Sequence, residues 1–139
     1  MNYVLDTNVV SELRKPRPAP QVVDWHVAQD PAHLFLTTIT LAEAWQGFHL
    51  LESAHPDYDR IKAFVVELPR RYRVLNFDAR AAKAWGEMTA QADGPLPLRD
   101  SLIGAIARSR GYRVVTRDTA PFARMGCKIV NPWQAEAAP

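Results

Sequence analysis

The chain opens with MNYVLDTNVVSEL, residues 1–13, and this stretch decides the fold prediction. Residues 3–5 are bulky or β-branched and favour a strand. The strand is expected to stop at Asp6-Thr7-Asn8, because these residue types form turns and cap helices. Apolar residues then recur at helical spacing within residues 9–13. The stretch therefore predicts a strand, a polar turn and a helix, with Asp6 at the carboxyl end of the strand.

Asp6 stands where an open parallel sheet usually binds its ligand, because ligands of such sheets lie outside the carboxyl ends of the strands. The same side chain could instead cap the helix that follows, as could Asn8. Residues 1–13 alone leave both interpretations open, and the remainder of the chain has to decide between them.

Strand-like and helix-like segments alternate along the rest of the chain. Further strands are predicted at residues 33–37, 73–76, 112–116 and 128–130. Amphipathic helices are predicted at residues 20–30, 40–53, 57–68, 78–88 and 98–110. Pro69 is expected to end the third of these helices, and Gly111 to cap the last. This alternation predicts an α/β fold with a central, mostly parallel sheet of four or five strands that is covered by helices.

The length and composition predict one globular domain. The 139 residues are 47% hydrophobic and 23% charged, which suits a chain with a single core. We expect the domain to span residues 1–133 and residues 134–139 to fray. No segment approaches the roughly 20 apolar residues of a membrane span, and we see no secretory signal. With Cys127 as the only cysteine, we expect a cytoplasmic protein that has no internal disulfide and no zinc–thiolate site.

Three more acidic residues stand at predicted junctions between elements. Glu43 and Asp100 each fall in the first turn of a predicted helix, and Asp118 directly follows a predicted strand. Helix starts that follow strands lie at the same edge of a parallel sheet as the strand ends. Topology therefore predicts that Asp6, Glu43 and Asp118 meet. The connection at residues 93–97 is long enough to bring Asp100 to the same edge.

Each of these acids also has an ordinary structural interpretation. Thr40-Leu41-Ala42-Glu43 matches the capping box, in which the glutamate accepts a hydrogen bond from a backbone N–H at the helix start. Asp100 would suit the helix dipole at any helix start, and Asp118 could cap a short helix after it. These interpretations explain each acid singly, but they do not explain why all four fall at one edge.

Four carboxylates at one edge predict a site for a divalent cation. Two carboxylates about 4 Å apart repel by about 4 kcal/mol at an effective dielectric of 20, so the cluster needs a neutralising charge. Arg99 and Arg117 adjoin acids and could supply part of it. All-oxygen ligation suits Mg²⁺ or Mn²⁺, which can activate water for attack on a phosphodiester. The candidate catalytic and metal-ligating residues are Asp6, Glu43, Asp100 and Asp118, with Thr116 and Asn8 in support.

The charge balance points to an anionic partner. The net charge is +2, and it rises to +6 over the rest of the chain when the four acids are left out. A surface of this sign suits a nucleic acid. Arg14 and Lys15 follow Asp6 by one helix and are candidate RNA contacts, although basic residues are also common on ordinary solvated surfaces.

Four segments resemble the motifs of one known family in order and spacing. They are Leu5-Asp6-Thr7-Asn8-Val9-Val10-Ser11-Glu12-Leu13, Thr40-Leu41-Ala42-Glu43, Arg99-Asp100-Ser101-Leu102-Ile103-Gly104-Ala105 and Thr116-Arg117-Asp118-Thr119. The family is that of the PIN-domain proteins, and in particular the VapC toxins of the FitB-like branch, which Phe122 and Asn131-Pro132-Trp133 also resemble. One difference is mild: the third acid, Asp100, is followed by serine where the motif commonly has alanine.

The resemblance implies a PIN-like α/β domain and the activity of a Mg²⁺- or Mn²⁺-dependent endoribonuclease that cleaves single-stranded RNA. It implies the toxin role in a type II toxin–antitoxin pair. The acids that hold the metal in the family match Asp6, Glu43, Asp100 and Asp118, and a supporting residue matches Thr116. It also implies a homodimer and an antitoxin whose C-terminal segment blocks the active site, with operator DNA bound only through the antitoxin.

Other functions stand as alternatives. A haloacid-dehalogenase-like phosphatase needs a second acid two residues after the strand-end aspartate, where this chain has Asn8. A receiver domain needs a late lysine, whereas the late strand here ends in Thr116-Arg117-Asp118. The main alternative is a catalytically silent PIN-fold module that acts only by binding its antitoxin and DNA.

The helices at residues 40–53 and 57–68 are predicted to form the interface of the homodimer. They carry more large apolar residues than a sheet of this size needs to cover it, and symmetric pairing would bury them. These residues are Trp45, Phe48, Leu51, Phe64 and Val65.

Overall fold

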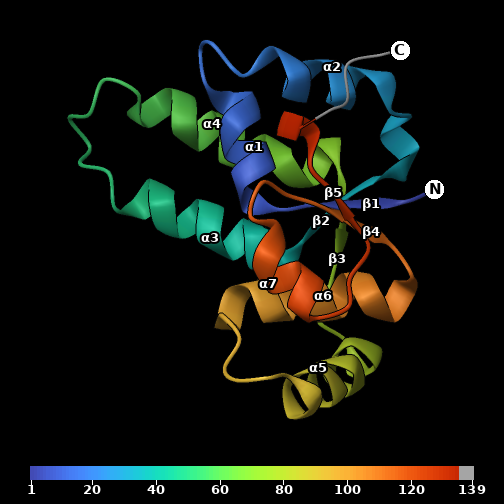
Figure 1. Cartoon of the computed structure of the whole chain (residues 1–139). Helices are drawn as coiled ribbons and strands as arrows, with labels where there is room; N and C mark the ends of the chain where they lie inside the picture. Colours follow the sequence, from blue (N-terminus) through green and yellow to red (C-terminus); the bar gives the residue numbers. More distant parts are fainter. Residues whose placement is uncertain (135–139) are drawn as a thin grey trace.

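The structure, a computed structural model that describes residues 1–134, is built on a five-stranded sheet in which every neighbouring pair of strands is parallel (Figure 1). The strands are β1 (Tyr3–Leu5), β2 (Leu34–Thr37), β3 (Arg73–Leu75), β4 (Arg113–Val115) and β5 (Ile129–Val130). Their order is β3-β2-β1-β4-β5, so the first strand of the chain lies in the middle of the sheet. The predicted α/β fold class is confirmed.

Helices connect the strands and cover both faces of the sheet (Figure 1). The α-helices are α1 (Thr7–Arg14), α2 (Pro20–Ala28), α3 (Thr38–His49), α4 (Tyr58–Arg71), α5 (Ala79–Gln91), α6 (Leu98–Arg110) and α7 (Thr119–Arg124). Two short 3₁₀ helices are η1 (Pro31–His33) and η2 (Pro132–Gln134). Gly111 caps α6 with φ 71°, a backbone conformation that favours glycine, as predicted.

The start of α3 differs from the prediction. The helix begins at Thr38 directly after β2, and its cap is Thr37, whose Oγ1 accepts a hydrogen bond from the Thr40 amide at 3.2 Å. The alternative interpretation of Glu43 as part of a capping box with Thr40 is therefore not supported, and Glu43 lies beyond the first turn, in which it was predicted. The chain offers threonines at 37, 38 and 40, and the one at the strand end is in place to cap.

Pro69 does not end α4, contrary to the prediction; the helix continues to Arg71. Proline lacks the N–H that would bond four residues back, so one backbone bond is missing in the last turn. The helix still ends with a regular bond, because the Tyr72 amide donates to the Leu68 carbonyl at 3.1 Å. Arg70 and Arg71 also suit the negative end of the helix dipole.

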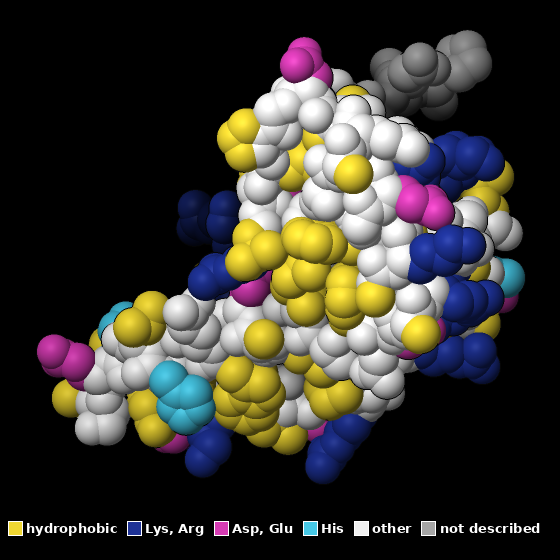
Figure 2. All heavy atoms as spheres, turned by 90° about the horizontal axis from the view of Figure 1, so that it is seen from below, with side chains coloured by type: hydrophobic (Ala, Val, Ile, Leu, Met, Phe, Trp, Pro, Cys, Tyr) yellow, Lys and Arg dark blue, Asp and Glu magenta, His cyan; other side chains and the backbone are white. Residues whose placement is uncertain are grey.

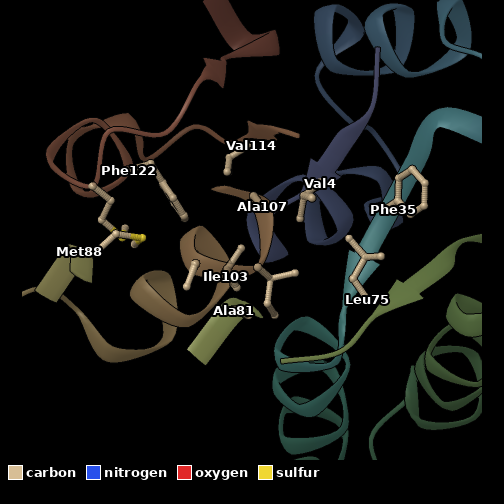
Figure 3. Close-up of a cluster of buried hydrophobic side chains, with 12 residues drawn as sticks. Val4, Phe35, Leu75, Ala81, Met88, Ile103, Ala107, Val114 and Phe122 are labelled. Carbon is tan, nitrogen blue, oxygen red and sulfur yellow. The ribbon is translucent and has the colours of Figure 1, made fainter. Parts of the chain in front are cut away.

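The sheet separates two hydrophobic clusters, because successive residues of a strand point to opposite faces. Val4 of β1 lies in one cluster, where Figure 3 shows it together with Ile103 and Phe122, from α6 and α7. Leu5 lies in the other, which is formed with residues of α1, α2 and α4. The small residues of α6 belong to the first cluster: a Cβ on Gly104 would lie 2.9 Å from Met125 Sδ. The small face of α6 therefore serves close packing.

The α3–α4 hairpin uses part of its apolar surface within the chain. Phe48 and Val65 are only 3% and 2% exposed, and the rings of Phe48 and Tyr58 lie 4.8 Å apart. Trp45 stays 36% exposed. The hairpin projects from the body of the molecule, and Figure 2 shows hydrophobic side chains gathered on the face beside this projection. The homodimer stays a prediction, and fewer of the predicted interface residues are free to serve it.

The C-terminal end is only partly described. Gln134, the first residue of the predicted frayed tail, is the last residue of η2. Residues 135–139 lie outside the described part of the chain. Within residues 1–134, none of the helices combines the length and apolar character needed to cross a membrane.

Candidate active site

One cavity of about 430 Å³ is lined by four carboxylates from four separate places in the fold, and also by Glu12 of α1. Asp6 follows β1 at the start of α1, Glu43 lies within α3, Asp100 lies in the first turn of α6, and Asp118 lies between β4 and α7. Figure 1 shows these elements converging near the centre of the molecule. The structure thus brings together all four acids that the sequence singled out, and their chemical roles remain predictions.

Asp6 both caps α1 and lines the cavity. One carboxylate oxygen, Oδ1, accepts a hydrogen bond from the Thr7 amide at 2.8 Å, and Oδ2 accepts one from Thr116 Oγ1 at 2.7 Å. The side chain is buried. The two interpretations of Asp6 that the sequence left open are therefore compatible, because a carboxylate has enough lone pairs to serve both.

Burial raises the pKa of Asp6 to about 6. The hydrogen bonds from Thr116 and Thr7 oppose this rise, whereas the nearby charges of Asp100 and Glu43 add to it. The pKa of Asp100 is also raised, first by burial and then by the charges of Asp118 and Glu43. The acids therefore act on one another electrostatically across the cavity.

Thr116 links the acids on β1 and β4. Its buried Oγ1 donates to Asp6 and accepts hydrogen bonds from the Asp118 amide at 3.0 Å and from Asn8 Nδ2 at 3.2 Å. Asn8 Oδ1 in turn accepts a bond from the Arg117 amide at 3.4 Å. Both residues predicted to support the acids thus hold the loop that carries Asp118 against the end of β1.

Glu43 is held by residues that the sequence did not indicate. Thr7 Oγ1 donates to Glu43 Oε1 at 2.9 Å and lies 3.1 Å from Thr40 Oγ1. Arg99 Nη1 lies 3.5 Å from Glu43 Oε2, so Arg99 is a counterion of Glu43 and not of its neighbour Asp100. The only local signal for Thr7 is its place beside Asp6 in the polar turn.

The capping interpretation of Asp118 is not supported, because its side chain makes no capping hydrogen bond to α7. Asp118 is exposed and lines the cavity. Asp100 does lie in the first turn of α6, so its interaction with the helix dipole and its place at the cavity are both present.

The donor chemistry of the cavity suits a hard cation. Its acidic side chains offer oxygen only, which is the ligand type that Mg²⁺ and Mn²⁺ prefer. Within residues 1–134, however, no three Asp, Glu, His or Cys side chains are arranged so that they could together hold a metal ion. A cation here would therefore take few direct protein ligands from the arrangement described.

The mouth of the cavity carries residues that the sequence interpretation missed. Buried Glu12 of α1 accepts hydrogen bonds from Lys15 Nζ at 3.0 Å and from Trp133 Nε1 at 3.3 Å. The pKa of Glu12 is lowered, chiefly by the bond from Lys15. Arg117 lies over the ring of Trp133, 5.4 Å from its centre. Among the candidate RNA contacts, Lys15 lines this cavity, whereas Arg14 lines a neighbouring one between α1, α3 and α4.

The chain is similar to known proteins over nearly its whole length. The PIN domain model matches residues 3–127. The chain is 39% identical to the plasmid stability protein StbB of Pseudomonas syringae pv. tomato, with 95% of this chain and 99% of that protein covered. It is 38% identical to the VapC ribonuclease Y4jK of Sinorhizobium fredii, with 94% and 97% covered.

A similar solved structure is that of FitAcB from Neisseria gonorrhoeae. It superimposes with a TM-score of 0.85 at 29% identity and covers 95% of this chain and 99% of the other. The match of the domain model extends over nearly the whole described sheet and over all four acids. On the strength of the model, the relatives and the five-stranded parallel sheet, this chain belongs to the PIN-domain family.

Proposed function

We propose that this protein is a divalent-metal-dependent endoribonuclease, the toxin of a type II toxin–antitoxin pair, which cleaves phosphodiester bonds of single-stranded RNA with an activated water. One observation carries the proposal: four carboxylates from separate elements line one cavity. Neighbouring acids contribute to the raised pKa values of Asp6 and Asp100. Such a cluster is unfavourable without a cation among its members. The 38% identity to a VapC ribonuclease supports the reaction class.

The residues at the cavity fit Mg²⁺ or Mn²⁺ as the metal. We propose that Asp6, Glu43, Asp100 and Asp118 hold it, some of them through water. Mg²⁺ keeps several waters and binds through few protein carboxylates, which agrees with the lack of a three-ligand group in residues 1–134. When bound, the ion would lower the pKa of a coordinated water and stabilise negative charge on the phosphodiester oxygens.

The chain's own residues would keep the carboxylates aimed at the cavity. Thr116 and the Thr7 amide each occupy one oxygen of Asp6, which fixes the plane of its carboxylate. The Thr7 hydroxyl and Arg99 do the same for Glu43. Side chains held in this way lose little orientational freedom when a ligand or metal binds, which is the usual role of residues behind a metal ligand.

The partners follow from the relatives. One similar structure is described as FitAB bound to an IR36 DNA fragment (TM-score 0.86, 28% identity), and another as DNA-bound VapBC from Salmonella typhimurium (0.80, 26%). We propose a cognate antitoxin for this chain, whose C-terminal segment blocks the cavity and which alone contacts operator DNA. We propose a homodimer as the working unit, and the cytoplasm as its location because its substrate is RNA.

The second candidate function is a silent PIN-fold module that acts only through its antitoxin and DNA. It is kept because the relatives include complexes bound to DNA. The presence of all four carboxylates at one cavity favours the enzyme, since a module without catalysis has no need to gather them.

The deciding experiment is cleavage of single-stranded RNA by the purified full chain in Mg²⁺ or Mn²⁺. The enzyme predicts cleavage by the parent and its loss in Asp100→Asn. Asp24→Asn is the matched control, because Asp24 is exposed on α2 and does not line the cavity. No cleavage by the parent would favour the silent module. Equal cleavage by all three proteins would indicate a contaminating nuclease.

A further inference from the structure

The acids of the cavity carry the same sign of charge as an RNA substrate. Four carboxylates would repel the phosphates of an RNA strand, so the chain must offer positive charge where the strand enters. Two basic residues, Lys15 and Arg117, line the same cavity. They differ in one respect that matters for binding: Lys15 forms an ion pair with Glu12, whereas no acidic side chain of residues 1–134 forms one with Arg117.

Lys15 forms an ion pair with Glu12. Its Nζ lies 3.0 Å from Glu12 Oε2, and the Glu12 side chain is only 9% exposed. A buried carboxylate must be paired, so this bond neutralises much of the charge of Lys15. An ammonium has three donors, and two remain. Lys15 therefore contributes less net attraction than a free cation would.

Arg117 has its charge available. Among residues 1–134, no acidic side chain forms an ion pair with it, and the side chain is exposed. Its guanidinium lies over the face of the Trp133 ring, 5.4 Å from the centre. A ring that takes the flat face of a guanidinium leaves the N–H donors at its edges free. The contact with the ring favours this position of the guanidinium and leaves it able to bind a phosphate with two parallel hydrogen bonds.

Trp133 is itself fixed by a buried charge. Its Nε1 donates to Glu12 Oε1 at 3.3 Å, and its amide donates to Asn131 Oδ1 at 3.0 Å. η2, the last described turn, packs against α2, and the bond from Trp133 to Glu12 joins it to α1; in Figure 1 it is the short red helix near these two helices. Glu12 thus holds the Trp133 ring, and the Trp133 ring contacts Arg117. Arg117 in turn directly precedes Asp118 in the sequence.

We propose that Arg117 binds a backbone phosphate of the RNA strand next to the bond that is cleaved, and that Trp133, anchored by Glu12, is its positioning residue. The proposal rests on the proposed function, since it assigns the substrate contact of the same cavity. Arg117 touches the substrate, whereas Trp133 and Glu12 act through Arg117. The contact exists before and during the reaction, so its loss should raise KM and leave kcat nearly unchanged.

A purely structural role for Trp133 makes different predictions. Trp133 packs against the cluster that includes α1 and α2, so its removal will lower stability in any case. If that were its whole role, the losses caused by changes at Trp133 and at Arg117 would add. If Trp133 acts by holding Arg117, the two losses will not add, because the second change removes what the first has already disabled.

The first experiment measures KM and kcat of the Arg117→Gln variant on a single-stranded RNA oligonucleotide. It also measures the affinity of this variant, in chelator, for the same oligonucleotide labelled with fluorescein. We expect KM and the dissociation constant to rise about tenfold, as for one charge-assisted contact. The slope of affinity against salt should fall by about 0.7, the value for one phosphate contact on a single strand. Arg73→Gln is the matched control, an exposed arginine at the start of β3 and outside the cavity.

The second experiment is a double-substitution cycle on the same RNA. Trp133→Phe keeps an aromatic face and should retain KM within about threefold of the parent, whereas Trp133→Leu should approach Arg117→Gln. The variant that carries both Arg117→Gln and Trp133→Leu should be no weaker than Arg117→Gln alone. Thermal melting of each variant shows which of them are folded at the assay temperature.

Two results would overturn the inference: an unchanged KM and salt slope in Arg117→Gln, or additive losses in the cycle. The first would leave Arg117 and Trp133 as a surface for a protein partner. The proposed function fails in a different way, namely by lack of metal-dependent cleavage in the parent. In that case the binding arm in chelator still decides whether Arg117 holds an RNA phosphate.

Discussion

Thr116 and Asp6, 110 positions apart in the sequence, share a buried hydrogen bond of 2.7 Å, and the same threonine oxygen accepts the amide of Asp118. Backbone bonds already join β1 to β4, among them that from the Asp6 amide to the Val115 carbonyl at 2.9 Å. The Thr116 hydroxyl adds a link between the carboxylate of Asp6 and the loop that carries Asp118.

Replacing Thr116 with valine keeps the shape of the side chain and removes its hydroxyl. Asp6 loses a donor and the Asp118 amide loses an acceptor, so the free energy of unfolding should fall by about 1–3 kcal/mol. Cleavage should fall by about 10- to 100-fold, as for other residues that orient metal ligands. Denaturant melts and initial rates measure the two effects. Thr116→Ser retains the hydroxyl, and a comparable loss of cleavage in that variant would contradict this explanation.

Replacing Asp6 with asparagine should separate stability from activity. Asparagine keeps the size and can still accept the cap bond from Thr7. Its amide nitrogen cannot accept the bond from Thr116, but this loss is offset because one charge leaves a cluster whose members repel. In chelator the variant should be at least as stable as the parent, and in Mg²⁺ its cleavage should be lower by orders of magnitude. Cleavage within about threefold of the parent would make Asp6 only a cap. Asp24→Asn serves as the control.

The metal-free protein should lose stability as the pH rises. The pKa of Asp6 is about 6 in the folded chain against 3.8 for an ordinary aspartate, so folding favours its protonated form. The stabilising contribution is complete below about pH 4 and is lost as the pH passes 6. From about pH 5 to pH 8 the parent should lose on the order of 1–2 kcal/mol relative to Asp6→Asn. Parallel pH curves for the two proteins in chelator would contradict the raised pKa.

Binding of a divalent cation should be visible without any reaction. A ligand that binds only the folded chain raises its stability, so Mg²⁺ or Mn²⁺ should raise the melting temperature of the parent. The rise should shrink in Asp6→Asn and in Asp100→Asn, and excess EDTA should abolish both the rise and the cleavage. Full cleavage in excess chelator would contradict the proposed metal dependence.

The sequence predicted the sheet well because the signals for it are local. Each strand is a short apolar run followed by polar residues, and the order of elements alone brings Asp6, Glu43 and Asp118 to one edge. Errors arose where local signals compete. Thr37 and Thr40 are both plausible caps, and only the end of β2 decides in favour of Thr37.

The mouth of the cavity could not be predicted, because its contacts join distant parts of the chain. Thr7 reaches Glu43 across 36 positions, and Trp133 reaches Glu12 across 121. Nothing in the neighbourhood of either residue indicates such a partner. Arg99 shows the same limit: it adjoins Asp100 in sequence, yet helix geometry directs it to Glu43.

The central place of β1 has a consequence for synthesis of the protein. β1 leaves the ribosome long before its neighbour β4, which begins only at Arg113. Until that late segment emerges, Asp6 has neither Thr116 nor Asp118 beside it, and α1, with eight residues, is too short to stay helical alone. The cavity can assemble only after β4 and the loop that carries Asp118 have left the ribosome. A growing chain without these segments lacks the complete group of four carboxylates, which would delay the activity of the proposed toxin until they emerge.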